Sequence, residues 1–167
     1  MSQFKELPQV EFAVAAQNAF KKFFQFNGRI RRSEYWWGFL TLFIAAFVIS
    51  LVPFVGPLVA LVLSIAGISM QFRRLHDTGR SGWWWAAQAC VGTISCTLFF
   101  VSFNFSAYLE AIRSQDIQAA MNVLISAITS ITGIIAIVFY LINIALGITI
   151  LVFLLQDSQP DANKYGE

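Results

Sequence analysis

Charge is scarce in this sequence and absent from two long stretches. Only 12% of the 167 residues are charged and 57% are hydrophobic, whereas soluble domains carry about 25% charged residues. No Asp, Glu, Lys, Arg or His occurs in residues 35–71 or in residues 83–106. Because a domain of this size buries only part of its surface, this composition excludes an ordinary water-soluble fold. We therefore predict that lipid surrounds most of the chain.

Cysteine and histidine are also scarce, which limits the available chemistry. Cys90 and Cys96 lie six residues apart in one apolar run, roughly 9 Å of helical rise and beyond disulfide reach. We interpret both as buried hydrophobic residues. The single histidine, His76, leaves a metal-dependent phosphohydrolase without ligands, and no nucleophile elbow or phosphate-binding glycine loop occurs. The sequence predicts no metal site, no cofactor and no catalytic residues.

Four apolar segments are the expected transmembrane helices of an all-α, integral membrane four-helix bundle made of two helical hairpins. A span of 18 residues covers about 27 Å of helix, just enough for the hydrocarbon core. The second segment is short, so a re-entrant hairpin over residues 53–72 stays an alternative. The start of the last segment is also open, because residues 123–155 are apolar throughout. The expected spans are Tyr35–Val52, Leu58–Phe72, Trp83–Phe105 and about Thr132–Leu155.

The residues before the first span predict an amphipathic helix. After a frayed start over residues 1–8, apolar side chains of residues 9–26 recur on one helical face, with lysines away from it. Such a helix either lies in the membrane interface or packs on the rest of the protein. Ser33 and Glu34 are candidate caps for the next helix. We divide the chain into a cytoplasmic segment (1–34), a four-helix domain (35–155) and a cytoplasmic tail (156–167).

The distribution of cations predicts the orientation. Lys and Arg number six in residues 1–37, three around His76, one in residues 106–122 and one in the tail. Cations collect on the cytoplasmic side of membrane proteins. We therefore expect a multi-pass membrane protein with both termini in the cytoplasm. No cleavable signal peptide is expected, since the first apolar run begins only at Tyr35.

The segment FRRLHDTGRSGWWW, residues 72–85, interrupts the apolar tract. We expect a cytoplasmic loop in which Asp77 pairs with neighbouring arginines and His76 bonds to the backbone, with Gly79, Ser81 and Gly82 shaping the turn. The alternative is a membrane-embedded enzyme that uses His76 and Asp77 for proton transfer.

Arginines and aromatic residues at this boundary suggest a site for anionic lipid headgroups. Arginine forks match phosphate oxygens, and aromatic rings sit at headgroup level. A non-enzymatic envelope scaffold that binds lipid or a membrane-protein partner is therefore the preferred function, without nucleic acid. The candidate contacts are Arg29, Arg31, Arg32, Arg73, Arg74, Arg80, Trp36 and Trp83.

A small oligomeric transporter or channel component is the other alternative. Polar residues within spans mark transport pathways, and here Gln88, Asn104 and Asn143 qualify. The pairs Ser126/Ser130 and Asn143/Gly147 have the spacing that permits close helix contact between or within subunits.

Three motifs carry a resemblance to a known family. FNGRIRRSEYWW, RRLHDTGRSGWWW and the terminal NKYGE together resemble the DUF805 family of small bacterial inner-membrane proteins, over about residues 20–167. The resemblance implies a four-helix integral membrane protein and no established activity. One departure is the lead-in QPDA before the terminal motif, where a glycine-containing stretch is expected.

Overall fold

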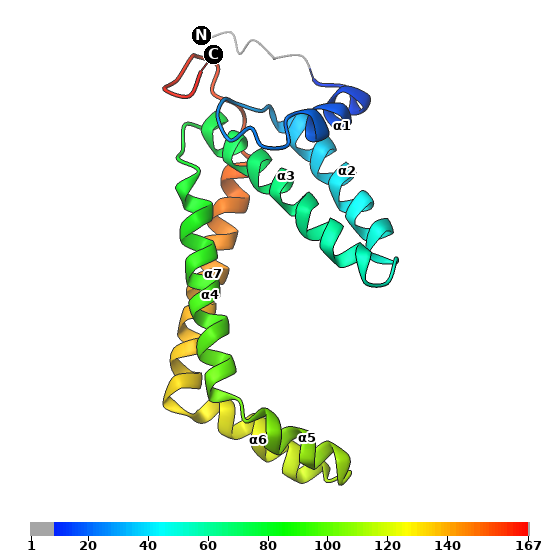
Figure 1. The fold of residues 1–167 in the computed structure, drawn as a ribbon. Coiled ribbons are helices and arrows are strands. Elements are labelled where there is room, and N and C mark those ends of the chain that lie inside the picture. The colour runs from blue at the N-terminus through cyan, green and yellow to red at the C-terminus, as the bar shows by residue number, and fades with distance from the viewer. Residues whose placement is uncertain (1–8, 167) are drawn as a thin grey trace. The chain divides into compact units, whose positions relative to one another are not determined.

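The computed structural model describes residues 9–166, and these form seven helices (Figure 1). The expected frayed start and Glu167 lie outside the described residues. Four helices are long and apolar enough to cross a membrane, which confirms the all-α membrane fold. The helices are α1 (Phe12–Lys21), α2 (Arg32–Ser50), α3 (Val55–Asp77), α4 (Trp83–Ser102), α5 (Phe105–Arg113), α6 (Ile117–Thr129) and α7 (Ile131–Leu155).

Two compact units make up the chain: residues 1–85 with 150–167, and residues 86–149. In the first unit α2 and α3 pack together as a hairpin, and α1 packs on α2. Helix α3 is continuous for 23 residues, about 34 Å, so residues 55–72 run in one direction without a turn. Helix α3 thus has the length of a full crossing.

The core of the first unit joins its helices to the end of α7. Gly38 of α2 faces Met70 of α3, and a Cβ atom at Gly38 would overlap the methionine side chain. The absence of a side chain there lets the two helices approach. The core comprises Ala19, Ile30, Tyr35, Leu42, Ala66, Met70, Leu75, Ile150 and Leu154.

Helices α4 and α7 of the second unit are joined by polar groups and glycines. Asn143 donates Nδ2–H to the Gln88 carbonyl oxygen at 2.8 Å. A Cβ atom at Gly92 would lie 2.9 Å from the Asn143 amide nitrogen, and one at Gly147 would lie 2.8 Å from the Gln88 amide nitrogen. Each amide therefore fits against a glycine of the opposite helix, and both amides contribute to helix packing.

The sequence places the end of the third span at Phe105 and a segment of mixed composition at residues 106–122. In the structure α4 ends at Ser102, and residues 105–129 form two helices that pack together, α5 and α6. Asn104 and Asp116 explain where they begin: each side-chain oxygen accepts a hydrogen bond from a backbone N–H three residues on, at 3.1 Å and 2.9 Å. Both helices leave an apolar stripe exposed, formed by Phe105, Leu109, Ile112, Ile117, Met121 and Ile125.

The cysteines are not buried as the sequence suggested. Cys90 and Cys96 are both free and exposed on α4. The prediction was wrong because an apolar residue of a spanning helix can face lipid as readily as protein.

Candidate functional site

The polar segment expected as a loop is helical through Asp77, where α3 ends. The prediction placed the helix end at Phe72 because five polar or charged residues follow within the next six. These residues extend the helix by more than a turn and bury Arg73, Arg74, Leu75, His76 and Asp77. The turn itself occupies residues 78–82, where Gly79 adopts a φ of 75° and Gly82 lies against the Phe72 ring.

Asp77 is the centre of a buried ion-pair cluster. Its carboxylate accepts hydrogen bonds from Arg29 Nε, at 3.1 Å, and from Arg74 Nη1. The side chains of Arg29, Arg74 and Asp77 are only 8%, 0% and 3% exposed. Buried charges are tolerated only when they are paired and hydrogen-bonded, so each member of this cluster depends on the others.

Arg74 caps the end of α7. It donates Nε–H to the Leu154 carbonyl oxygen at 3.1 Å and Nη2–H to the Gln156 carbonyl oxygen, and its Nη1 also lies 3.3 Å from Ser158 Oγ. The last carbonyls of a helix lack intrahelical partners, and a cation there complements the helix dipole. Arg74 thus fastens the end of α7 to the end of α3.

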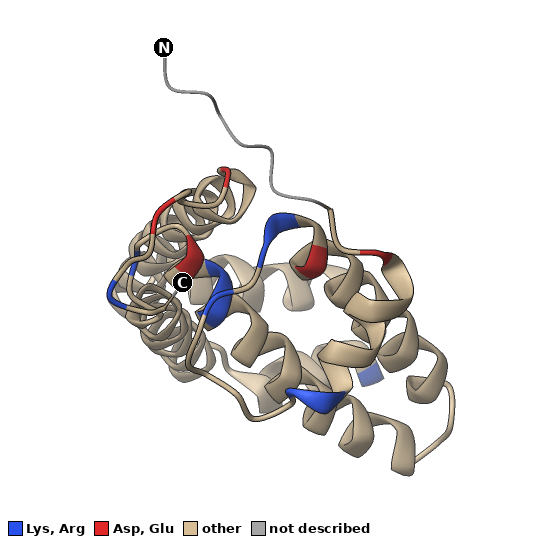
Figure 2. Cartoon of the chain, turned by 90° about the horizontal axis from the view of Figure 1, so that it is seen from above, with Lys and Arg blue, Asp and Glu red and all other residues tan. Residues whose placement is uncertain are grey.

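Arg29 binds the segment that follows α7. Its guanidinium donates to the carbonyl oxygens of Asp161, at 2.9 Å, Gln159 and Gly166. The Gln159 N–H donates in turn to the Asp77 carbonyl oxygen at 3.1 Å. Acidic and basic segments accordingly gather beside the C-terminus (Figure 2). Sequence reasoning missed this docking of the tail, since its partners are up to 137 positions apart.

Residues 163–166 of the terminal motif form a tight turn that rests on His76. Asn163 and Gly166 exchange backbone hydrogen bonds of 3.0 Å, and Asn163 Nδ2 donates to the His76 carbonyl oxygen at 2.9 Å. The Tyr165 ring stacks on the imidazole with centroids 3.8 Å apart and planes 5° apart. The terminal motif, one of those that carried the family resemblance, is therefore a contact element.

This arrangement does not assemble a catalytic pair. The described partner of His76 Nδ1 is the Gly28 carbonyl oxygen at 3.3 Å, whereas the Asp77 carboxylate is taken up by two arginines. Ser81 Oγ accepts the Trp83 N–H at 3.3 Å. Among residues 9–166 no three His, Cys, Asp or Glu side chains could hold a metal ion. These polar side chains of residues 72–85 make hydrogen bonds and ion pairs with other parts of the protein.

Two of the arginines that the sequence predicted to contact lipid headgroups are buried in the protein. Arg73 and Arg74 are 2% and 0% exposed, so their interpretation as surface cations is wrong. Within the described residues, Nε and Nη2 of Arg73 have no hydrogen-bond partner, and Glu34 supplies an opposing charge. The reason is the extended α3, which carries both side chains into the protein interior.

The other predicted contacts have different surroundings. Arg80 lies 3.8 Å above the Phe153 ring centroid, and Trp36 packs on the core. Arg31 occupies the N-cap position of α2. Arg32 is exposed and pairs weakly with Asp157 at 3.5 Å, and Trp83 is 75% exposed.

Helix α1 adds a surface next to the start of α2. Val10 N–H donates to Ser33 Oγ at 3.0 Å, and Asn18 Nδ2 donates to Glu34 Oε1 at 2.8 Å. Ser33 therefore binds the segment before α1, and Glu34 binds α1. Neither is the N-cap of α2, which is Arg31 and makes no side-chain cap, although Glu34 lies in the first turn as expected. Buried Ala15 and Ala19 lie on the inner face of α1. The outer face exposes Val14, Phe20 and Lys21.

Comparison with known proteins assigns the family. The family described as "Protein of unknown function (DUF805)" matches residues 23–167. The chain belongs to the DUF805 family. This DUF805 protein is 34% identical over 76 residues to inner membrane protein YhaH of Escherichia coli K12, covering 38% of this chain and 63% of YhaH. It is 33% identical over 91 residues to inner membrane protein YhaI of the same strain, covering 50% of this chain and 68% of YhaI.

The match to YhaH thus spans less than two thirds of that relative's length. No solved structure matches this chain. Both named relatives are inner membrane proteins, in agreement with four helices able to span a membrane.

The stack of Tyr165 on His76 gives a first test of the docked tail. We expect Tyr165→Ala to loosen residues 159–166, because an aromatic pair is worth about 0.5–1.5 kcal/mol. Amide hydrogen exchange of these residues should accelerate by roughly 2- to 10-fold. Tyr165→Phe is the control and should exchange like the wild type, since it keeps the ring. Equal exchange in the alanine variant and the wild type would contradict the contact.

Proposed function

We propose that this DUF805 protein is a non-enzymatic membrane scaffold whose cytoplasmic face rests on anionic lipid headgroups. The proposal is carried by α1, which buries Ala15 and Ala19 on one side and exposes Val14, Phe20 and Lys21 on the other. That division is typical of a helix lying in the membrane interface.

The depth of α1 supports this placement. Its hydrogen bonds reach Ser33 and Glu34 in the first turn of α2, and its Phe12 ring packs edge-on against Trp37 at 5.6 Å between centroids. A spanning helix begins with charged and aromatic residues at the headgroup level. Helix α1 is thus held at the depth where its exposed apolar side chains can enter the lipid boundary.

Basic side chains that could contact headgroups must lie outside the buried cluster of Arg29, Asp77 and Arg74. Lys21 and Arg32 are exposed and Lys22 is half-buried, and all three lie in or beside α1 and the start of α2. Each basic residue near an anionic membrane surface contributes about 1 kcal/mol. The assignment of this face to the cytoplasm follows from the excess of Lys and Arg in residues 1–37.

Lipid selectivity tests the proposal. Lys21→Gln/Lys22→Gln/Arg32→Gln should lose about 3 kcal/mol of attraction to phosphatidylglycerol, roughly a hundredfold in apparent affinity. Native mass spectrometry of protein from mixed phosphatidylglycerol and phosphatidylethanolamine bilayers measures it. Arg113→Gln, which removes the cation of α5, is the matched control and should keep the wild-type preference. The same lipid ratio in both variants would refute the headgroup contact.

A further inference from the structure

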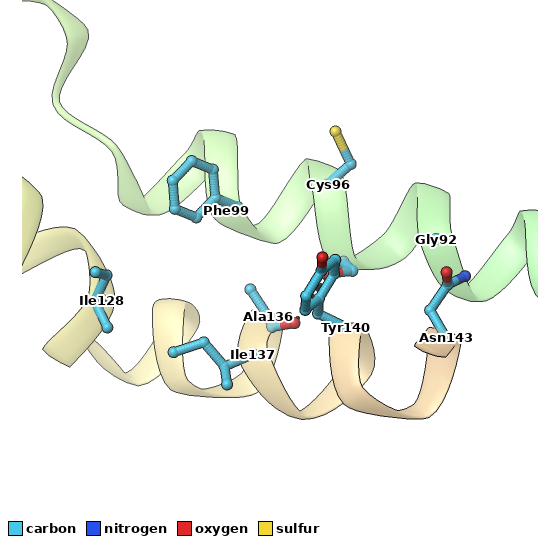
Figure 3. A pocket seen from close by; sticks show the side chains of 9 residues that line it. Gly92, Cys96, Phe99, Ile128, Ala136, Ile137, Tyr140 and Asn143 are labelled. Atoms are coloured by element: carbon cyan, nitrogen blue, oxygen red, sulfur yellow. Dashed lines mark hydrogen bonds between the residues drawn. The ribbon is translucent and has the colours of Figure 1, made fainter. Parts of the chain in front are cut away.

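A pocket of about 540 Å³ lies within the second unit, outside the surface proposed for headgroups. Its volume falls in the usual range of ligand sites, about 300–1,000 Å³. Helices α4 and α7 form its walls, with one residue from α6 (Figure 3). The lining residues are Gly92, Ser95, Cys96, Phe99, Ile128, Ala136, Ile137, Tyr140 and Asn143.

The position of the pocket restricts what can enter it. Both α4 and α7 have the length and hydropathy of membrane spans, so the surrounding solvent is hydrocarbon. Residues 92–99 occupy the half of α4 nearest α5, and residues 136–143 occupy the half of α7 nearest α6. Each range holds eight residues, whose seven helical steps rise by about 10 Å, within the roughly 15 Å depth of one leaflet. The pocket therefore opens at the depth of the tails of a single leaflet.

The polar groups of the wall are engaged within the protein. Ser95 Oγ–H donates to the Ala136 carbonyl oxygen at 2.9 Å, and Asn143 Nδ2–H donates to the Gln88 carbonyl oxygen at 2.8 Å. Tyr140 adds a hydroxyl on a ring that is 58% exposed. Recognition of a polar ligand needs groups aimed at it, and these contacts leave the wall mainly apolar. A hydrocarbon chain matches such a wall better than a headgroup or a polar solute.

We propose that this pocket binds one acyl tail of a bilayer phospholipid, taken from the leaflet next to α5 and α6. The small side chain of Ala136 leaves room for the tail beside the contact between the two helices. Dispersion contacts along the chain supply the affinity, because each carbon of the tail meets several wall atoms. The site is independent of the headgroup contact at α1, which belongs to the other unit.

The two cysteines of α4 provide a matched pair for the test. Both are exposed, but only Cys96 belongs to the pocket lining. Cys96→Trp fills the pocket, whereas Cys90→Trp adds the same side chain to the same helix outside it. A third variant, Lys21→Gln/Lys22→Gln/Arg32→Gln, distinguishes this site from the proposed headgroup contact. It should bind a lipid tail in the pocket as the wild type does.

The probe is phosphatidylglycerol with a photoreactive diazirine in one tail, reconstituted with the full chain in vesicles. Wild type and Cys90→Trp should be labelled mainly within residues 92–99 and 136–143, with about tenfold less label there in Cys96→Trp. Label spread evenly along α4, or unchanged in Cys96→Trp, would overturn the proposal. Should Cys96→Trp fail to fold, the position of the label in the wild type decides: an unlabelled pocket means that protein side chains fill it and the proposal is wrong.

Discussion

Asp77→Asn is expected to destabilise this DUF805 protein by about 3–5 kcal/mol, the usual cost of removing one partner from a buried ion pair. Asparagine keeps the shape of the side chain but not the charge that Arg29 and Arg74 share. Two buried guanidinium groups are then left without a counter-charge. The contact between the ends of α3 and α7 is weakened, because Arg74 makes it. Unfolding in mixed micelles with increasing dodecyl sulfate, followed by circular dichroism, measures the loss.

Asp157→Asn is the control for this substitution. Asp157 also pairs with an arginine, Arg32, but its side chain is 95% exposed. Exposed ion pairs contribute less than about 1 kcal/mol, so this variant should unfold like the wild type. Equal effects of the two substitutions would show that the buried ion pairs of Asp77 do not stabilise the contact between α3 and α7.

The second large effect is expected where α4 meets α7. Gly92→Leu and Gly147→Leu each place a side chain where the Asn143 or Gln88 amide lies, within 3 Å of the glycine's missing Cβ. Overpacking of this kind costs about 1–3 kcal/mol. Gly92→Leu also displaces the Asn143 amide, so this variant loses the hydrogen bond from Asn143 to the Gln88 carbonyl oxygen. The same unfolding measurement in mixed micelles reports the change.

Gly67→Leu is the matched control, because nothing lies within 4 Å of a Cβ atom built at Gly67 in α3. Leucine is a better helix former than glycine by up to about 0.8 kcal/mol. We therefore expect this variant to be as stable as the wild type or slightly more so. Equal destabilisation at positions 67, 92 and 147 would mean that α4 and α7 do not pack through their glycines.

The membrane spans could be predicted from the sequence because hydrocarbon tolerates so little charge. Runs free of charged residues, residues 35–71 and 83–106, coincide with α2, most of α3 and α4. The start of α7 at Ile131 lies one residue from the predicted crossing. These elements follow from local composition and length alone.

The end of α3 could not be predicted in the same way. Arg73, Arg74 and Asp77 read as a surface loop because charges are expensive to bury. Their burial depends on partners from distant segments, including Arg29 and Leu154. The sequence did suggest that Asp77 pairs with an arginine, but nothing local indicated that Arg74 would cap α7.

Helices α5 and α6 were missed for a related reason. The α5 segment mixes apolar and charged residues and has no span-length apolar run, so it reads as a connection. Helix α6 carries no charge, but its second half belongs to the apolar run of residues 123–155, which hides its end. The caps at Asn104 and Asp116 were present in the sequence and could have marked both starts. The apolar stripe of each helix also follows the helical period, which is a second sequence signal for these helices.

The docked tail is the central structural claim, and a photoreactive residue tests it most directly. p-Benzoylphenylalanine in place of Tyr165 keeps an aromatic ring beside His76, whose ring centroid lies 3.8 Å from that of Tyr165. Irradiation of intact cells, followed by peptide mapping, should find the crosslink within residues 72–79 at the end of α3. Crosslinks to lipid alone, or to a segment outside the α3 end and Arg29, would contradict a tail held by the Arg29–Asp77–Arg74 cluster.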